Sequence, residues 1–403
     1  MGGISMKQTT KIAARWRCLA VGTVAMLFAG VLYAWSILKT PLASEFGWTA
    51  SALALNFTLA MSFFCIGGLL GARIAKRAGH RVALVIGGVL SAAGFGLTAA
   101  LQGASVAGLY VSYGLLAGTG IGIAYNVVIG TVSAWFPDKK GLCSGCLMMG
   151  FGASALVLGN AADALFKSAL GWRATYGILG MGICAVLCLA GFLLRKPEGA
   201  AQQATQNPGT EAGYTPGQML CRPAFWMAFV CISFLAAVGS SVISFARDLA
   251  LSVKAPEALA VSLVGVLSVC NGLGRILTGA LFDRLGRRKT MLLANLLTMG
   301  AAAVTLLAVC LGSLPLCIAG LCLTGISYGA CPTITAAFTS SFFGMKHFST
   351  NMAIMTFTVM GGSLIATLSN KVLELTGGYT ATFGMLLGLT CGALVLNLFI
   401  KKP

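Results

Sequence analysis

Long apolar stretches alternate with short polar segments along the whole chain, and charged positions are concentrated in the polar segments. Each apolar stretch has about twenty or more residues, which is enough for a helix to cross the hydrocarbon core of a bilayer. The sequence therefore predicts an all-α membrane protein with twelve transmembrane helices, over residues 16–38, 51–75, 82–101, 107–134, 142–165, 173–194, 223–246, 259–282, 290–311, 316–341, 348–370 and 378–400.

Composition supports the same class. Apolar residues make up 58% of the 403-residue chain and charged residues only 9%, which leaves too little polar surface to cover a soluble globule of this size. The fourteen cysteines fall mostly within the apolar stretches, where cysteine behaves as a small buried residue.

Basic residues separate to two sides when the twelve helices are numbered from a cytoplasmic N-terminus. Apart from Arg275, all are expected on the inner side except Lys39, Lys167, Arg173, Arg247, Lys254 and Lys371. Insertion places the Lys- and Arg-rich loops in the cytoplasm, so both termini are expected there, in a multi-pass protein of the cell (inner) membrane. The net charge of +18 then reflects topology and contact with membrane lipid, and no nucleic-acid partner is expected.

One long polar segment, residues 195–222, lies midway along the chain and is expected to be a cytoplasmic linker. It separates an N-terminal six-helix half, 1–194, from a C-terminal six-helix half, 223–403. A short repeat supports this division, because the basic loop 76–81 after the second helix corresponds to 283–288 after the eighth. Equivalent loops indicate parallel structural repeats, the organisation of several transporter folds.

Arg275 is the exception in the charge pattern, because it alone is expected deep inside an apolar stretch. A guanidinium in hydrocarbon costs about 3 kcal/mol, so it normally faces a protein-lined cavity and meets a negative partner. The nearest acid, Asp283, is two turns away, and reaching it or the interface is the structural alternative. Asn271, one turn earlier, can present an amide on the same face. Arg275 is therefore predicted to bind an anionic substrate.

Twelve helices, two halves, a long central loop and the repeated basic loop together resemble the major facilitator superfamily. The resemblance implies a cytoplasmic gate in the repeated loops, where an acid precedes the basic residues. Asp283 matches that acid, whereas Lys76 replaces it in the first half. Simple anchoring of the loops by positive charge is the alternative. The candidate gating residues are Lys76, Arg77, Asp283, Arg284, Arg287 and Arg288.

Narrower motifs resemble the oxalate:formate antiporter family. They occur in order at residues 33–36, 118–125, 135–142, 222–226 and 271–275, and at Phe343-Gly344 with Asn351. The resemblance implies that Arg275 is the substrate-binding arginine. Oxalate-transporting members add a lysine in the eleventh helix, and Met360 stands at that position here. A site with one fixed charge matches a monoanion better than a dianion.

Aromatic residues on the helices that line the cavity in this superfamily are candidates for the pocket wall, since tyrosine hydroxyls can donate to carboxylate oxygens. They are Tyr33, Tyr125, Tyr328 and Phe357, and ordinary helix packing is the alternative for each of them.

Other chemistry is not indicated. Cys143 and Cys146 form a CxxC without further metal ligands, and the glycines at 118–122 follow no strand, so neither a metal nor a cofactor is expected. The spans carry no catalytic motif or phosphate loop, and an enzyme is not expected. The sequence predicts a secondary transporter of small monocarboxylates of the formate, lactate or pyruvate type, working by anion exchange, without an obligate protein partner. Proton symport and oxalate:formate exchange remain open, and a channel is a formal alternative.

Overall fold

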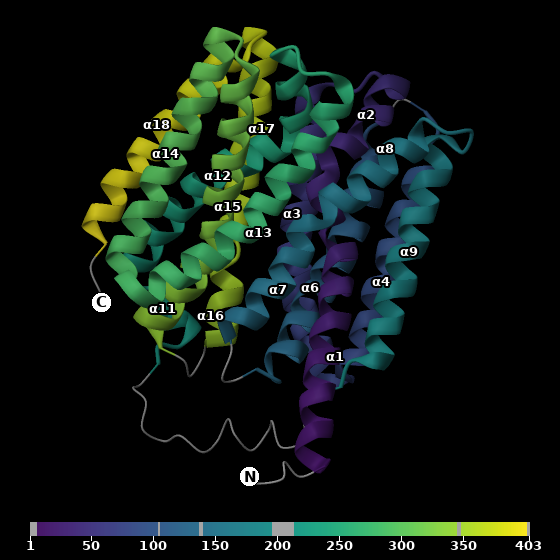
Figure 1. Cartoon of the computed structure of the whole chain (residues 1–403), viewed down its shortest axis with the longest axis vertical. Coiled ribbons are helices and arrows are strands. Elements are labelled where there is room, and N and C mark those ends of the chain that lie inside the picture. The colour runs from purple at the N-terminus through teal and green to yellow at the C-terminus, as the bar shows by residue number, and fades with distance from the viewer. Residues whose placement is uncertain (1–5, 104, 137–139, 196–212, 345–347, 401–403) are drawn as a thin grey trace.

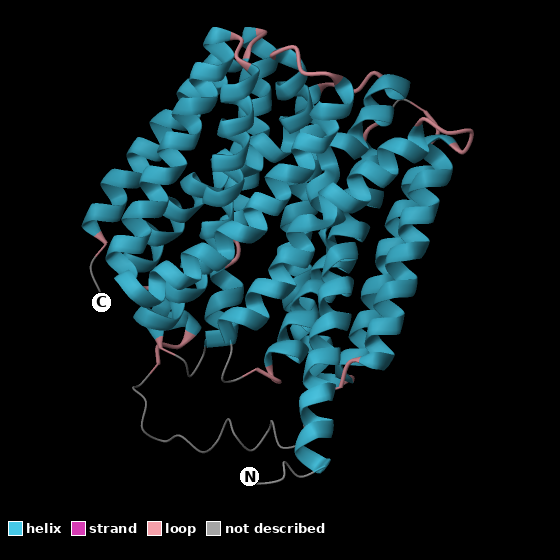
Figure 2. Cartoon of the chain, in the orientation of Figure 1, coloured by secondary structure: helices cyan, strands magenta, loops and turns pink. Residues whose placement is uncertain are grey.

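The computed structural model describes residues 6–103, 105–136, 140–195, 213–344 and 348–400. Within these ranges all regular elements are helices, and twelve spans are long and apolar enough to cross a membrane (Figures 1 and 2). The all-α, twelve-span prediction is confirmed.

Several of the first six spans are interrupted by a change of helix type. The first passes through the 3₁₀ segment η1, and the fourth and fifth contain the π-helical segments η2 and η3. In chain order, the six spans are α1 Met6–Ala29 with η1 Gly30–Ala34 and α2 Trp35–Phe46, α3 Ala50–Arg77, α4 Gly79–Ala99, α5 Ala107–Leu109 with η2 Tyr110–Ala117 and α6 Gly118–Ser133, α7 Lys140–Ser154 with η3 Ala155–Gly159 and α8 Asn160–Phe166, and α9 Gly171–Leu193.

The last six spans follow a short helix, α11 Pro216–Leu220, which lies within the segment expected to be linker. The eleventh of these spans is built from two separate helices, and the seventh is kinked at Phe245. They are α12 Pro223–Ser252, α13 Glu257–Leu285, α14 Arg287–Leu311, α15 Leu314–Phe343, α16 Phe348–Met355 with α17 Thr358–Thr376, and α18 Tyr379–Phe399.

Turns between spans carry the expected capping chemistry. Gly47 ends α2 in the left-handed conformation at φ 66°, which costs glycine little because it has no side chain. Thr49 then caps α3, accepting a hydrogen bond from the Ala52 amide at 3.2 Å. The chain therefore reverses direction over three residues.

The first span is longer than its apolar pattern indicated. Its apolar stretch ends near residue 38, but the helix continues through Pro41 to Phe46, and Lys39 lies inside it with only 7% of its surface exposed. The prediction that Lys39 lies in an outer loop beyond the first helix is therefore wrong. Lys39 is accommodated because its ammonium is 2.8 Å from the Asp248 carboxylate on α12.

The helices of the first six spans lie on one side of the bundle and those of the last six on the other (Figure 1). Contacts between the two sides are made mainly by α7 with α13 and by α3 with α17. The Thr58 and Thr367 hydroxyls, 2.7 Å apart, join α3 to α17. We call the end where α1 begins and α18 ends the terminal end, and the opposite end the far end.

Candidate functional site

Arg275 lies on α13 in the middle of the molecule and is 6% exposed. Its Nη1 donates to the Met148 sulfur and its Nη2 donates to the Tyr33 hydroxyl at 3.2 Å, while Nε has no partner among the described residues. Both acceptors are uncharged. A buried guanidinium normally requires a negative partner, so Arg275 has one positive charge that its described surroundings do not neutralise.

Glycines bring the neighbouring helices onto α13 at the turn that carries Arg275. A Cβ built on Gly274 would lie 2.1 Å from the Ile326 carbonyl oxygen of α15, and one on Gly329 would lie 2.0 Å from the Asn271 carbonyl oxygen. On the α7 side, a Cβ on Gly152 would lie 2.6 Å from the Ser268 carbonyl oxygen. These contacts are between backbones, and only glycine permits them. They fix the position of Arg275 between α7 and α15.

Aromatic rings from five helical elements other than α13 surround the guanidinium partners. Tyr33 meets Phe151 edge-on with ring centroids 5.0 Å apart, and Tyr125 meets Phe151 at 5.2 Å and Phe64 at 4.9 Å. Tyr328 on α15 lies 6.1 Å from Tyr33. An apolar wall with a few aimed polar groups is the usual design of a small-molecule site.

The structure brings three of the predicted residues to this cluster. Tyr33 contacts Arg275 directly. Tyr125 reaches it directly, through a side-chain hydrogen bond with the guanidinium, and also through Met148, because its hydroxyl donates to the same sulfur at 3.4 Å. Tyr328 belongs to the cluster because its ring contacts the Tyr33 ring. Its hydroxyl accepts a hydrogen bond from Ser240 at 3.4 Å.

Other predicted residues are not brought into contact with the guanidinium. Asn271 is fully buried, and neither atom of its amide has a partner among the described residues. Phe357, before α17, and Met360, on it, are half-buried, and the contacts found in the described ranges join neither to Arg275. Their role in binding stays a prediction.

Sequence reasoning missed Met148 and Phe151. Both lie on α7 one turn apart, in the run Met148-Met149-Gly150-Phe151-Gly152, and both face the same cluster. The glycines were visible as helix contacts, but an apolar residue beside them carries no chemical signal of its own. The spacing of three residues was the only available clue.

The candidate gating residues lie at the terminal end. Lys76 and Arg77 at the end of α3, and Arg284 and Arg288 at the junction of α13 and α14, are exposed. The side chains of Asp283 and Arg287 lie outside the described part of the structure. Gating by these loops stays a prediction.

Ion pairs join the two sides of the bundle at the far end. Lys39 pairs with Asp248 at 2.8 Å, and Lys167, which follows α8, pairs with Glu257 of α13 at 3.5 Å. Glu257 also accepts from Arg247 at 3.0 Å. The hydrogen bond that Lys167 donates to Asp163 raises the pKa of Lys167, so its ammonium stays charged at neutral pH. These pairs link the two sides of the bundle at the far end.

Replacing Asp248 with asparagine should loosen the far end, because Lys39 then loses its anionic partner. Asp248 is partly exposed, so we expect a loss of about 1 kcal/mol, or roughly fivefold faster opening. Amide hydrogen exchange over residues 247–257 measures it. Glu45→Gln is the matched control, because Glu45 pairs with Arg173 within the first six spans. Equal acceleration in both variants would contradict a bridging role for Asp248.

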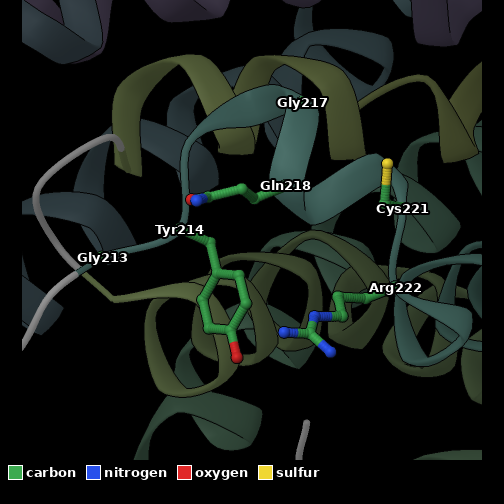
Figure 3. Close-up of a pocket in the computed structure, with 6 residues that line it drawn as sticks. All are labelled: Gly213, Tyr214, Gly217, Gln218, Cys221 and Arg222. Atoms are coloured by element: carbon green, nitrogen blue, oxygen red, sulfur yellow. The ribbon is translucent and has the colours of Figure 1, made fainter.

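A separate cavity of about 680 Å³ lies at the terminal end, around α11 (Figure 3). The Arg222 guanidinium lies 5.3 Å over the Tyr214 ring there. The Tyr214 amide donates to the Phe343 carbonyl at 2.9 Å, and the Asn351 amide donates to the Tyr214 carbonyl at 3.0 Å. Phe343 and Asn351, which belong to one sequence motif, thus anchor the chain segment that leads into α12.

Comparison with known proteins agrees with this architecture. The model of the Major Facilitator Superfamily matches residues 18–367 and 229–403. The nucleoside transporter NupG has a similar solved structure, with a TM-score of 0.75 over 96% of this chain and all of that one, at 13% sequence identity. That likeness shows the fold.

Several sequence relatives are transporters. The oxalate:formate antiporter of Oxalobacter formigenes is 31% identical over 294 residues, which cover 71% of this chain and 67% of that protein. The uncharacterized MFS-type transporter YhjX of Escherichia coli (strain K12) is 26% identical, covering 85% of this chain and 84% of its own. Monocarboxylate transporter 12 of Homo sapiens is 25% identical, covering 80% and 67%. The chain belongs to the major facilitator superfamily and is a membrane transporter that resembles the oxalate:formate antiporter family.

Proposed function

We propose that this transporter exchanges small organic monocarboxylates across the cell membrane by alternating access. One observation carries the proposal: among the described residues, the acceptors of the buried Arg275 guanidinium are all uncharged, namely the Met148 thioether and the hydroxyls of Tyr33 and Tyr125. A carboxylate would supply the missing charge and two acceptor oxygens that match the guanidinium fork.

Charge balance supports a monoanion over a dianion. The other residues described around Arg275 are aromatic, apolar or uncharged polar, and Met360 stands where the resemblance places a second cation. In a low-dielectric site an unbalanced second negative charge is expensive. Formate, lactate and pyruvate fit this site. Oxalate:formate exchange is the second candidate, supported by the relative that is 31% identical.

Exchange is favoured over proton symport by where the acids lie. All carboxylates with described side chains are at the far end, in ion pairs, and none is near Arg275. The described part of the path therefore offers no carboxylate to carry a proton across with the substrate. An empty carrier would also have to reorient with an unneutralised guanidinium, whereas a bound anion neutralises it.

Movement of the two six-helix halves, 1–194 and 223–403, supplies the alternation in this proposal. Arg275 and Tyr328 come from the second half, and Tyr33, Tyr125 and Met148 from the first, so an anion bound among them contacts both. The far-end ion pairs would break when that end opens, and the basic loops at the terminal end would then close. We place the terminal end in the cytoplasm, because most of the basic residues lie there.

Reconstituted vesicles test the exchange mechanism. Labelled formate, lactate or pyruvate should enter rapidly when the vesicles contain one of these anions, and at least about tenfold more slowly when they contain none, since an unpaired buried charge costs at least 1.4 kcal/mol. Uptake into anion-free vesicles driven by an imposed proton gradient would instead establish symport. Oxalate uptake faster than that of all three monoanions would favour the second candidate.

A further inference from the structure

The Met148 sulfur lies directly beside the Arg275 guanidinium. It accepts from the guanidinium Nη1 and, at 3.4 Å, from the Tyr125 hydroxyl. Two donors from different helices, α13 and α6, therefore converge on one thioether. A thioether is a weak acceptor, and two donors directed at it are poorly satisfied.

The backbone around Met148 is held by a close helix contact, and its side chain is of a flexible type. Met148 is 8% exposed, and the next residue, Met149, packs its Cα against Gly272 of α13, where an added Cβ would lie 3.0 Å away. This close approach of α7 and α13 places the sulfur at the guanidinium. Methionine is unbranched with three rotatable bonds, so the thioether can move aside while both helices stay in contact.

Charge-assisted hydrogen bonds to a carboxylate are roughly twice as strong as neutral ones, and arginine can make two in parallel. We propose that Met148 is a resident uncharged ligand of Arg275, which the substrate carboxylate displaces when it binds. This inference rests on the proposed function. The carboxylate takes Nη1 from the thioether and also receives the Tyr125 hydroxyl, while Met148 turns toward the aromatic rings.

Met148 is thereby a specificity-determining residue. A ligand must be a stronger hydrogen-bond acceptor than its thioether in order to displace it from the guanidinium. A ligand whose oxygens are weaker acceptors than a carboxylate, such as an amide or an alcohol, gains less over the thioether. Because Met148 is uncharged, an incoming carboxylate can bind Arg275 without first breaking an ion pair between Arg275 and a protein carboxylate.

Two substitutions of similar volume test acceptor strength against packing. Met148→Leu removes the acceptor, and the KM for labelled formate in exchange should fall about fivefold, the effect of one neutral hydrogen bond. Met148→Gln supplies a stronger acceptor, and the KM should rise by a similar factor. Met149→Leu is the matched control, since Met149 is an adjacent methionine with a 37% exposed side chain.

A lower KM for formate in Met148→Leu and a higher KM in Met148→Gln would support the proposal that the substrate displaces Met148. Equal KM values, or an increase in both variants, would show that Met148 only packs, and would overturn the proposal. That result would leave the proposed function intact, provided that the wild-type chain exchanges anions and Arg275→Ala does not. If the wild-type chain exchanges none of formate, lactate and pyruvate, the proposed function fails and this inference fails with it.

Discussion

Replacing Arg275 with alanine should abolish anion exchange while the helical bundle stays folded. The substitution removes the one buried cation described at the centre of the site and leaves a substrate carboxylate without its partner. Loss of one member of a buried hydrogen-bonded charge pair costs about 2–5 kcal/mol, which corresponds to roughly thirtyfold to several thousandfold. Initial rates of labelled formate exchange in reconstituted vesicles measure it.

Two further variants separate charge from geometry. Arg275→Lys keeps the charge but not the planar fork, and it should recover only a small part of the rate. Arg195→Ala removes an exposed arginine after α9 and should leave exchange unchanged. If Arg275→Ala transports normally whenever it is folded, the guanidinium is a structural group and anion binding must be sought elsewhere.

Replacing Gly274 with alanine should have the second largest effect, because it separates the two helices that position Arg275. The added Cβ would lie 2.1 Å from the Ile326 carbonyl oxygen, and backbone cannot yield as a flexible side chain can. Overpacking of this kind costs about 1–3 kcal/mol. We expect a lower midpoint of thermal unfolding, and a loss of exchange that exceeds the loss of folded protein because the adjacent guanidinium is displaced.

Gly279→Ala is the control on the same helix. Its added Cβ would have the Thr333 side chain at 4.0 Å as its nearest neighbour, so no atom need move. This variant should match the wild-type chain in melting and exchange, or be slightly more stable, since alanine favours helix. Equal behaviour of the two alanine variants would mean that the α13–α15 contact does not control the site.

Hydropathy was sufficient to predict the fold, because lipid permits little besides helices long enough to cross it. It failed where a polar group finds a partner from a distant part of the chain. A lysine at position 39 suggests that the helix has ended, yet the helix continues through it. Its ammonium forms an ion pair with Asp248, which lies more than two hundred residues later in the chain. No local pattern contains that information.

The candidate site was predictable to the extent that its residues carry unusual chemistry. Arg275 is recognisable as a cation in an apolar stretch, and Tyr33 as a hydroxyl in a motif. Met148 has neither a charge nor a hydroxyl that would mark it in the sequence. Its place beside the guanidinium follows only from the close approach of α7 to α13. Met360 shows the converse, since a motif position marked it although no described contact joins it to Arg275.

The ion pairs of the far end also affect the electrostatic attraction that an anion meets at each end of the transporter. All acids with described side chains lie there, each beside a base, in the pairs Glu45–Arg173, Asp163–Lys167, Asp248–Lys39, Glu257–Arg247 and Glu374–Lys371. The terminal end instead exposes arginines such as Arg73, Arg77, Arg81, Arg284 and Arg288. A field of one sign raises the local concentration of counter-ions and speeds their association, and salt weakens it. For the anionic substrate proposed above, we therefore expect stronger long-range attraction, and a steeper dependence of the association rate on ionic strength, at the terminal end than at the far end.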